Sequence, residues 1–201
     1  MELELKRGGR TARVETLGGE LVSYRDERGL EYIWGGDPAY WPGRNPLLFP
    51  IVGMLKEGKI RFDGREYAME RHGFARRREF TPAARGEDWV RLELRESAET
   101  LALYPYSFRL AVEQRLTDTG FSTAVTVANP GEGPLPFCLG AHTGFRCPLE
   151  AGERFEDYEL VFPERESCPT LLLRDGLLDR PAALPCLEDT DTLPLDYRWF
   201  D

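Results

Sequence analysis

The stretch FRLAVEQRLTDTGFSTAVTVA, residues 108–128, decides the fold. Apolar and polar residues alternate in both of its halves, as they do in strands that bury one face of a sheet. The residues expected on the buried faces are Phe108, Leu110, Val112, Phe121, Thr123, Val125 and Val127. Between the halves, Asp118-Thr119-Gly120 forms a short loop with glycine where a positive φ is expected. The stretch therefore predicts a β-hairpin.

The same alternation continues outward along the chain. Val90, Leu92 and Leu94 alternate with charged residues, and Gly18-Gly19 divides a similar pair of runs near the N-terminus. The 20 glycines and 15 prolines leave no long helical pattern, and only Ser97–Leu103, with Ser97 as N-cap, is expected to form a short helix. We predict an all-β sandwich or barrel in a single domain covering residues 1–201.

Composition and charge exclude several classes of protein. Of the 201 residues, 41% are apolar and 11% aromatic, which is enough for a packed core. The formal net charge of −9 disfavours nucleic acid and anionic lipid as partners. No run approaches the roughly 18 apolar residues of a membrane span, and the acidic start MELELK is unlike a signal peptide. We expect a cytoplasmic protein that binds neither nucleic acid nor membrane.

The four cysteines give no sign of a metal site or of a disulfide framework. Cys138, Cys147, Cys168 and Cys186 have neither the paired short spacings of a zinc site nor the density of a small disulfide-rich protein. We expect reduced thiols and no bound metal.

The two histidines are the main candidates for chemistry near neutral pH, because the ordinary pKa of imidazole lies in that range. His72 stands in RHGFAR, residues 71–76, where Gly73 lets another backbone or a ligand approach closely. His142 stands in GAHTGF, residues 140–145, between small residues and an aromatic one. Such neighbours suit a concave site for a polar, ring-shaped ligand such as a sugar. The alternative is a structural or surface histidine held by a carbonyl group or by water.

These motifs resemble the aldose 1-epimerases, or galactose mutarotase-like proteins, and in particular their bacterial branch. The resemblance rests on blocks in the family's order and spacing, namely WPGRNPLLFPIVG (41–53), GKIRFDGREY (58–67), HGFAR (72–76) and GAH with Phe145 (140–145). It implies a galactose mutarotase-like β-supersandwich. It also implies an isomerase of carbohydrate metabolism that interconverts sugar anomers by acid/base ring opening and closure, with neither metal nor organic cofactor.

The resemblance also implies roles for individual residues. In the family, a carboxylate takes the proton of the anomeric hydroxyl while an imidazolium protonates the ring oxygen. Matched motif to motif, His142 corresponds to this general acid and His72 to a histidine that hydrogen-bonds the sugar. Arg44 and Arg76 lie in blocks that hold the phosphorylated sugar in related hexose-6-phosphate epimerases, and a guanidinium suits a phosphate or a diol. The alternative for each arginine is a solvated charge or a surface ion pair.

The chain departs from the family pattern in three places. Met54 stands where many relatives carry a sugar-contacting arginine, and Thr143 follows the second histidine where relatives often have proline. The family's catalytic glutamate and a sugar-binding aspartate lie beyond the region that resembles residues 193–200. We therefore expect the C-terminal strands of the supersandwich to be missing from residues 1–201, with open sheet edges that favour a homo-oligomer. The acids nearest to the motifs or to this region are Glu70, Glu79 and Asp201, and none is marked as a replacement base.

Two other functions stay open at this point. One is a carbohydrate-binding pseudoenzyme, in which His72, Arg44 and Arg76 keep the sugar pocket but the catalytic carboxylate is lacking. The other is a hexose-6-phosphate 1-epimerase, whose substrate is a sugar phosphate held by the arginines. The net charge of −9 argues mildly against the second.

Overall fold

The computed structural model describes residues 1–199, with only the backbone described at residues 180–185 and 199. Strands make up most of the regular structure, which confirms the all-β prediction. The chain forms two compact units, Met1–Arg146 and Cys147–Asp201, and each is described by itself. A single domain covering residues 1–201 stays a prediction. Among the described residues, no helix combines the length and the apolar character needed to cross a bilayer.

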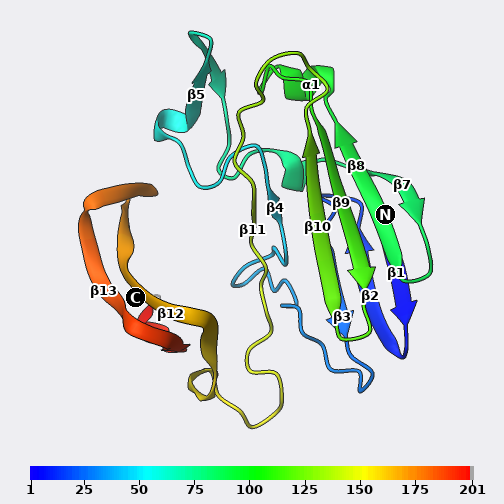
Figure 1. Ribbon diagram of the computed structural model, residues 1–201, viewed down its shortest axis with the longest axis vertical. Helices are drawn as coiled ribbons and strands as arrows, with labels where there is room; N and C mark the ends of the chain where they lie inside the picture. The colour runs from blue at the N-terminus through cyan, green and yellow to red at the C-terminus, as the bar shows by residue number, and fades with distance from the viewer. Residues whose placement is uncertain (200–201) are drawn as a thin grey trace. The chain divides into compact units, whose positions relative to one another are not determined.

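A four-stranded antiparallel sheet forms one layer of the first unit (Figure 1). Its strand order is β10-β9-β8-β7, with the bounds β7 Thr81–Arg85, β8 Trp89–Arg95, β9 Arg109–Leu116 and β10 Phe121–Ala128. Strands β9 and β10 pair from Leu116 opposite Phe121 to Arg109 opposite Ala128. This pairing confirms the hairpin predicted from residues 108–128.

A three-stranded sheet forms the second layer and lies behind β8–β10 in Figure 1. It consists of β1 Glu2–Arg7, β2 Arg10–Glu15 and β3 Leu21–Arg25, and the predicted turn at Gly18-Gly19 joins β2 to β3. Both sheets contribute to one apolar cluster, which includes Leu3, Leu5, Ala12, Val14, Val90, Leu92, Leu110 and Val112. Because burial of each large aliphatic side chain contributes roughly 1.5–3 kcal/mol, this shared core stabilises the sandwich.

The alternation in the sequence predicted the buried face of β8 fully and that of β10 only in part. Val90, Leu92 and Leu94 are all buried. In β10, Phe121 and Val125 are half-buried and Thr123 is exposed. The reason is that β10 is the edge strand of its sheet, so its side chains are covered from fewer directions.

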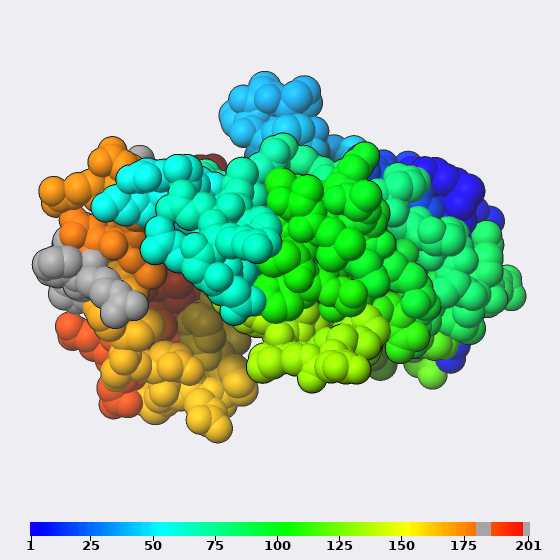
Figure 2. All heavy atoms as spheres, turned by 90° about the horizontal axis from the view of Figure 1, so that it is seen from above, coloured from blue at the N-terminus to red at the C-terminus, as the bar shows by residue number. Residues whose placement is uncertain are grey.

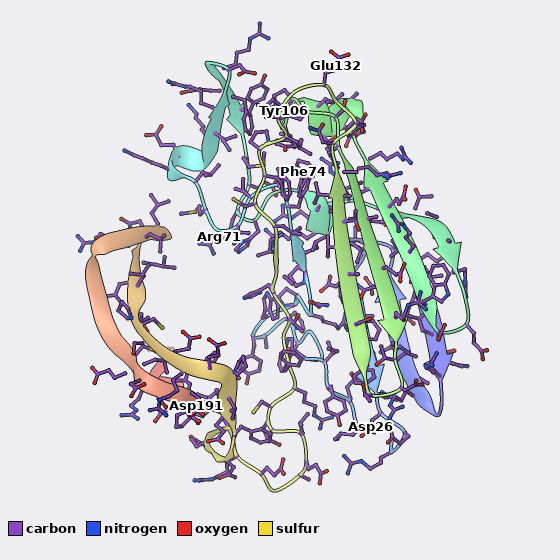
Figure 3. All side chains as sticks on the ribbon, viewed as in Figure 1. Asp26, Arg71, Phe74, Tyr106, Glu132 and Asp191 are labelled. Atoms are coloured by element: carbon purple, nitrogen blue, oxygen red, sulfur yellow. The ribbon has the colours of Figure 1, made fainter. Side chains whose placement is uncertain are left out.

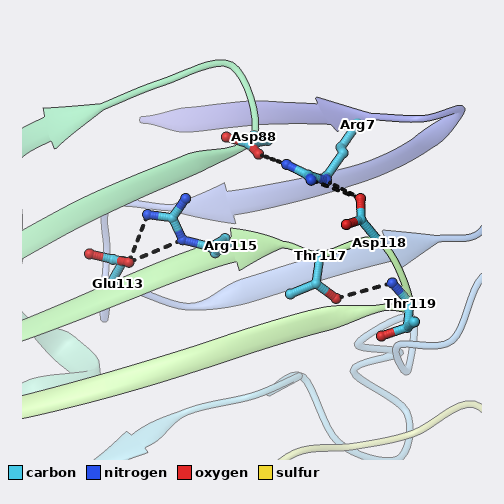
Figure 4. A network of polar contacts seen from close by, with 7 residues as sticks. All are labelled: Arg7, Asp88, Glu113, Arg115, Thr117, Asp118 and Thr119. Carbon is cyan, nitrogen blue, oxygen red and sulfur yellow. Dashed lines mark hydrogen bonds and ion pairs between the residues drawn. The ribbon is translucent and has the colours of Figure 1, made fainter.

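Charged side chains connect the two layers at one end of the sandwich (Figure 4). Arg7, at the end of β1, donates to Asp88 just before β8 and to Asp118 in the β9–β10 turn, the latter at 2.7 Å. Nearby, the guanidinium of Arg115 lies 5.0 Å from the ring centre of Trp89. Because exposed ion pairs contribute little stability singly, these contacts mainly orient the turns.

Shorter elements complete the first unit. They are β4 Leu47–Leu48, the 3-10 turn η1 Lys56–Gly58, β5 Lys59–Phe62, β6 Arg65–Ala68, the 3-10 turn η2 Ala75–Arg77, α1 Ala98–Leu101 and β11 Gly140–Ala141. The predicted N-cap of α1 is confirmed, since the Ser97 hydroxyl accepts from the Thr100 N–H at 3.2 Å. In return, the Ser97 N–H donates to the Thr100 hydroxyl at 2.8 Å.

An aromatic cluster lies between these elements and the four-stranded sheet. Its buried members are Phe49, Phe62, Phe74, Tyr104 and Phe108. Phe49 is central, with ring-centre distances of 5.2 Å to Phe108 and 6.0 Å to Tyr104. Figure 3 shows Phe74 among these packed side chains and Arg71 on the loop outside them. Aromatic pairs of this kind add roughly 0.5–1.5 kcal/mol beyond area burial, so the cluster anchors the loops that follow β4 and β6.

The second unit is built around one long antiparallel hairpin. Strand β12 covers Glu159–Arg174 and β13 covers Leu177–Pro194, with several register shifts between Val161 and Leu172. The 3-10 turns η3 Phe155–Asp157 and η4 Tyr197–Trp199 flank it. The four cysteines of the chain are free thiols.

Candidate functional site

Three stretches of chain lie side by side at the candidate site. The middle one, residues 46–53, contains β4 and is called the central segment below. On one flank, β11 pairs antiparallel with β4, with Gly140 opposite Leu48, and the two lie next to each other in Figure 1. On the other flank, Phe49 forms a parallel bridge with Gly73. The central segment therefore brings together two regions that are about 70 positions apart in the sequence.

His72 is fixed by Gly53 at the end of the central segment. The His72 N–H donates to the Gly53 carbonyl at 2.8 Å, and the Gly53 N–H donates to His72 Nδ1 at 3.0 Å. A ring nitrogen that accepts from an N–H carries no proton, so the neutral imidazole holds its proton on Nε2. This tautomer presents Nε2–H as a hydrogen-bond donor.

Gly73 allows the loop that carries His72 to lie against the central segment. Its φ is 70°, and a Cβ added at this position would lie 2.2 Å from the Phe49 carbonyl oxygen. The same oxygen accepts from the N–H groups of Phe74 and Ala75 at 3.0 and 3.2 Å. The close approach of another backbone expected at Gly73 is therefore confirmed.

His142 follows β11 directly and is held by its backbone. Its N–H donates to the Pro46 carbonyl at 3.1 Å, which continues the short β4–β11 ladder by one bond. The imidazole is exposed, and its ring centre lies 4.9 Å from that of Trp41, with the two rings at 77°. The backbone is fixed while the ring stays accessible to a ligand.

The structure brings the two histidines together. Their ring centres are 6.3 Å apart, and the ring planes are inclined by 22°. His72 is partly buried and His142 is exposed. Both rings can therefore contact one small molecule, while their chemical roles stay predictions.

Burial and positive neighbours disfavour a charge on His72. Burial is the main cause that lowers the pKa of His72 below its ordinary value, followed by the charges of Arg76, His142 and Arg71. The lowered pKa and the Gly53 N–H bond favour the same state. His72 is therefore neutral at neutral pH, with its proton on Nε2.

Arg76 lies close enough to His72 for its charge to act on that imidazole. Its Nη2 donates to the Arg71 carbonyl at 2.8 Å, whereas its Nε is buried and has no hydrogen-bond partner among the described residues. Burial, followed by the charge of Arg77, lowers the pKa of the Arg76 guanidinium. The position is electropositive, and its role in binding a ligand stays a prediction.

Arg44 lies two residues before the central segment, and its side chain bonds to the backbone of Gly35. Its Nε donates to the Gly35 carbonyl at 3.2 Å. Gly35 belongs to the stretch between β3 and β4, which stands out in light blue from the surface of the first unit in Figure 2. The Arg44 backbone contacts the loop that carries His142, because the Arg44 carbonyl accepts from the Gly144 N–H at 2.6 Å.

The acids nearest to the motifs are engaged elsewhere. Glu70 accepts from Arg77, and Glu79 accepts from the Thr16 hydroxyl and lies 3.4 Å from the N-terminal ammonium group. Asp201 lies outside the described residues. Within the described part of the chain, no three His, Cys, Asp or Glu side chains form a cluster able to hold a metal ion.

Sequence reasoning gave no role to three residues that shape the site. Trp41 contacts His142, Gly53 sets the tautomer of His72, and Glu20 accepts from two backbone N–H groups beside the central segment. Trp41 and Gly53 stand inside the block 41–53 that carries the family resemblance, so the block itself was the signal. No pattern in the sequence marks Glu20.

Comparison with known proteins gives one consistent result. The family described as Aldose 1-epimerase matches residues 1–177. The chain is 41% identical to the plasmid-encoded protein LacX and 40% identical to the chromosomal protein LacX, both of Lactococcus lactis subsp. lactis. Each alignment covers 100% of this chain and 70% of the relative.

Solved structures support the same relationship. A galactose mutarotase related enzyme from Lactobacillus acidophilus has a TM-score of 0.91 at 27% identity, covering 100% of this chain and 67% of its own. A galactose mutarotase-like protein from Lactobacillus casei has a TM-score of 0.86 at 30% identity, covering 98% and 68%. The predicted galactose mutarotase-like fold is therefore confirmed.

Proposed function

Because the chain belongs to the aldose 1-epimerase family, we propose that it interconverts the α and β anomers of an aldose. The anomeric hydroxyl gives its proton to a carboxylate, and the ring oxygen takes a proton from an imidazolium. The bond between C1 and the ring oxygen breaks as the C1 carbonyl forms. Rotation about C1–C2 and the reverse proton transfers then close the ring as the other anomer. We further propose that this takes place in the cytoplasm.

His142 is the proposed general acid. Its ring is exposed, so a bound sugar can reach it, and the His142 backbone is held by its hydrogen bond to Pro46. A positioned acid contributes about 100- to 10,000-fold to a rate. The close pair of rings favours protonation of only one of them at a time, because two neighbouring positive charges repel.

His72 is the proposed sugar ligand. Since the Gly53 N–H occupies Nδ1, the neutral ring offers Nε2–H to an oxygen of the sugar. A donor of fixed tautomer can place the ring oxygen next to His142 without itself giving up a proton. The lowered pKa of His72 supports this role, since a neutral His72 can donate a hydrogen bond without transferring a proton.

The observation that carries the proposal is the ring-centre distance of 6.3 Å between His72 and His142. This spacing lets both histidines contact atoms of one pyranose, and such placement can supply much of the acceleration. The proposal assigns proton abstraction to a carboxylate and gives this role to none of Glu70, Glu79 and Glu20.

The Nε of Arg76 has no hydrogen-bond partner in the described part of the chain, and this favours a second candidate function, the epimerisation of a hexose phosphate. A guanidinium beside the histidines could donate hydrogen bonds to the phosphate oxygens of such a substrate. In that case a sugar phosphate outcompetes the free sugar, and added salt weakens its binding because the charges are screened.

Polarimetry tests the proposal. Freshly dissolved α-galactose or α-glucose should change its optical rotation faster with the full-length protein than in buffer, and His142→Ala should lower kcat about 100-fold or more. His72→Ala should mainly raise KM. Acceleration that persists in His142→Ala would contradict the assigned acid. Saturable sugar binding in calorimetry without acceleration would identify a sugar-binding protein instead.

A further inference from the structure

The carboxylate of Glu20 holds residues 44 and 45, which directly precede the central segment. Glu20 lies in the β2–β3 hairpin, where its own backbone N–H donates to the Glu15 carbonyl at 3.0 Å. One oxygen of its side chain, Oε1, accepts from the Arg44 N–H at 2.9 Å and from the Asn45 N–H at 2.6 Å. Two successive backbone donors therefore converge on a single acceptor that belongs to the three-stranded sheet.

The same short stretch of chain holds the residues that follow His142. The Asn45 side chain, almost fully buried, accepts from the Thr143 hydroxyl at 2.6 Å. The Arg44 carbonyl accepts from the Gly144 N–H at 2.6 Å, and the Pro46 carbonyl accepts from the His142 N–H at 3.1 Å. Three successive residues on one side are thus bonded to three successive residues on the other.

We propose that Glu20 and Asn45 are positioning residues, which set the place of the His142 imidazole beside His72. The proposal rests on the proposed function, in which His142 is the acid. Glu20 fixes residues 44–45 from one side, and residues 44–46 fix residues 142–144 from the other. Neither residue is assigned any contact with the sugar.

Positioning is needed here because the regular pairing is short. Strands β4 and β11 contain two residues each, and His142 is the first residue after the pair. After His142, the hydrogen bonds from Thr143 to Asn45 and from Gly144 to Arg44 replace further strand pairing. Displacement of a catalytic group by 1 Å can lower a rate about 100-fold. Loss of these bonds should therefore affect the chemical step more than sugar binding.

Matched variants separate the hydrogen bond from the charge. Since both N–H groups use one oxygen, Glu20→Gln keeps an acceptor, whereas Glu20→Ala removes it. Thr143→Ser keeps the hydroxyl donor and Thr143→Val removes it. We expect Glu20→Ala and Thr143→Val to lower kcat about tenfold or more with KM nearly unchanged. Glu20→Gln, Thr143→Ser and the hairpin control Glu15→Ala should stay close to the wild type.

The sequence offers a readout that does not depend on turnover. Only two histidines are present, so the Cε1–H region of a 1H–13C NMR spectrum holds two imidazole signals, which His72→Asn assigns. We expect Glu20→Ala to shift and broaden the His142 signal, and Glu20→Gln to restore it. Glu20 bonds to residues 44 and 45, which in turn bond to residues 144 and 143, so a change that Glu20→Gln restores is transmitted by these hydrogen bonds.

The two proposals can fail separately. A wild-type protein without mutarotation would refute the proposed function, and the NMR comparison would still test the positioning role. If Glu20→Ala does not fold, the exposed Thr143 provides the test through its Val and Ser variants. A His142 signal that is unchanged in Thr143→Val and in any folded Glu20→Ala protein would overturn the positioning proposal.

Discussion

Replacement of Gly73 by alanine tests how the loop carrying His72 is built. A Cβ at this position would lie 2.2 Å from the Phe49 carbonyl oxygen, 2.5 Å from its carbon and 2.7 Å from the Pro50 nitrogen. All three atoms belong to the backbone of the central segment, so no side-chain rotation relieves the contact. The loop or the central segment has to move.

The size of the effect follows from two physical causes. A φ of 70° costs a residue with a Cβ about 1–2 kcal/mol relative to glycine. Forcing additional atoms into a packed region typically costs about 1–3 kcal/mol more. We expect Gly73→Ala to lower the free energy of unfolding by about 2–5 kcal/mol, a large share of the 5–15 kcal/mol typical of a domain.

Gly64 provides a matched control within the same unit. Its φ is 79°, but an added Cβ would meet no atom within 4 Å. Gly64→Ala should therefore show the backbone cost alone, about 1–2 kcal/mol. The difference between the two variants measures the contact with Phe49.

Urea unfolding followed by tryptophan fluorescence gives both values. Three of the four tryptophans, Trp34, Trp41 and Trp89, belong to the first unit, so the signal reports mainly on the unit that contains both glycines. If Gly73→Ala is no more destabilising than Gly64→Ala, the close approach of the loop to the central segment is refuted.

Two further predictions concern buried hydrogen bonds. Because the pKa of His72 is lowered by folding, the His72 side chain binds a proton more readily in the unfolded chain than in the folded one. The free energy of unfolding should therefore be highest above the ordinary imidazole pKa of about 6.5 and should fall as the pH decreases below it. His72→Asn, which keeps an acceptor for the Gly53 N–H, should flatten this part of the pH profile of urea midpoints, and an unchanged slope would contradict the assignment. Gln114 is buried and donates to the Gly19 carbonyl at 2.9 Å while accepting from the Thr123 hydroxyl at 2.6 Å. Gln114→Leu should therefore lower the free energy of unfolding by about 1–3 kcal/mol, and a urea midpoint equal to that of the wild type would contradict this role.

Local patterns were sufficient to predict the parts of the fold that local physics controls. Residues 108–128 form the expected hairpin because alternation and a glycine turn act within one short stretch. The Ser97 cap was predictable for the same reason, since its partner lies three residues away. The partial exposure of β10 was not predictable, because it depends on which strand ends up at the edge of the sheet.

The candidate site shows the same division. The small residues around His72 and His142 suggested a ligand, but the spacing of the two rings depends on bridges between stretches distant in the sequence. Glu20 was invisible to sequence reasoning because its partners are backbone N–H groups, which every residue except proline has. The long β12–β13 hairpin was also missed, since residues 159–174 contain two prolines and no sustained alternation.

Main-chain hydrogen bonds hold the backbone of both histidines: the His142 N–H donates to the Pro46 carbonyl and the His72 N–H donates to the Gly53 carbonyl. Bonds of this kind do not depend on the identity of the side chains around them. A residue such as Met54 can therefore change during evolution, or in a laboratory selection for a new sugar preference, while the backbones of the two histidines keep these hydrogen bonds.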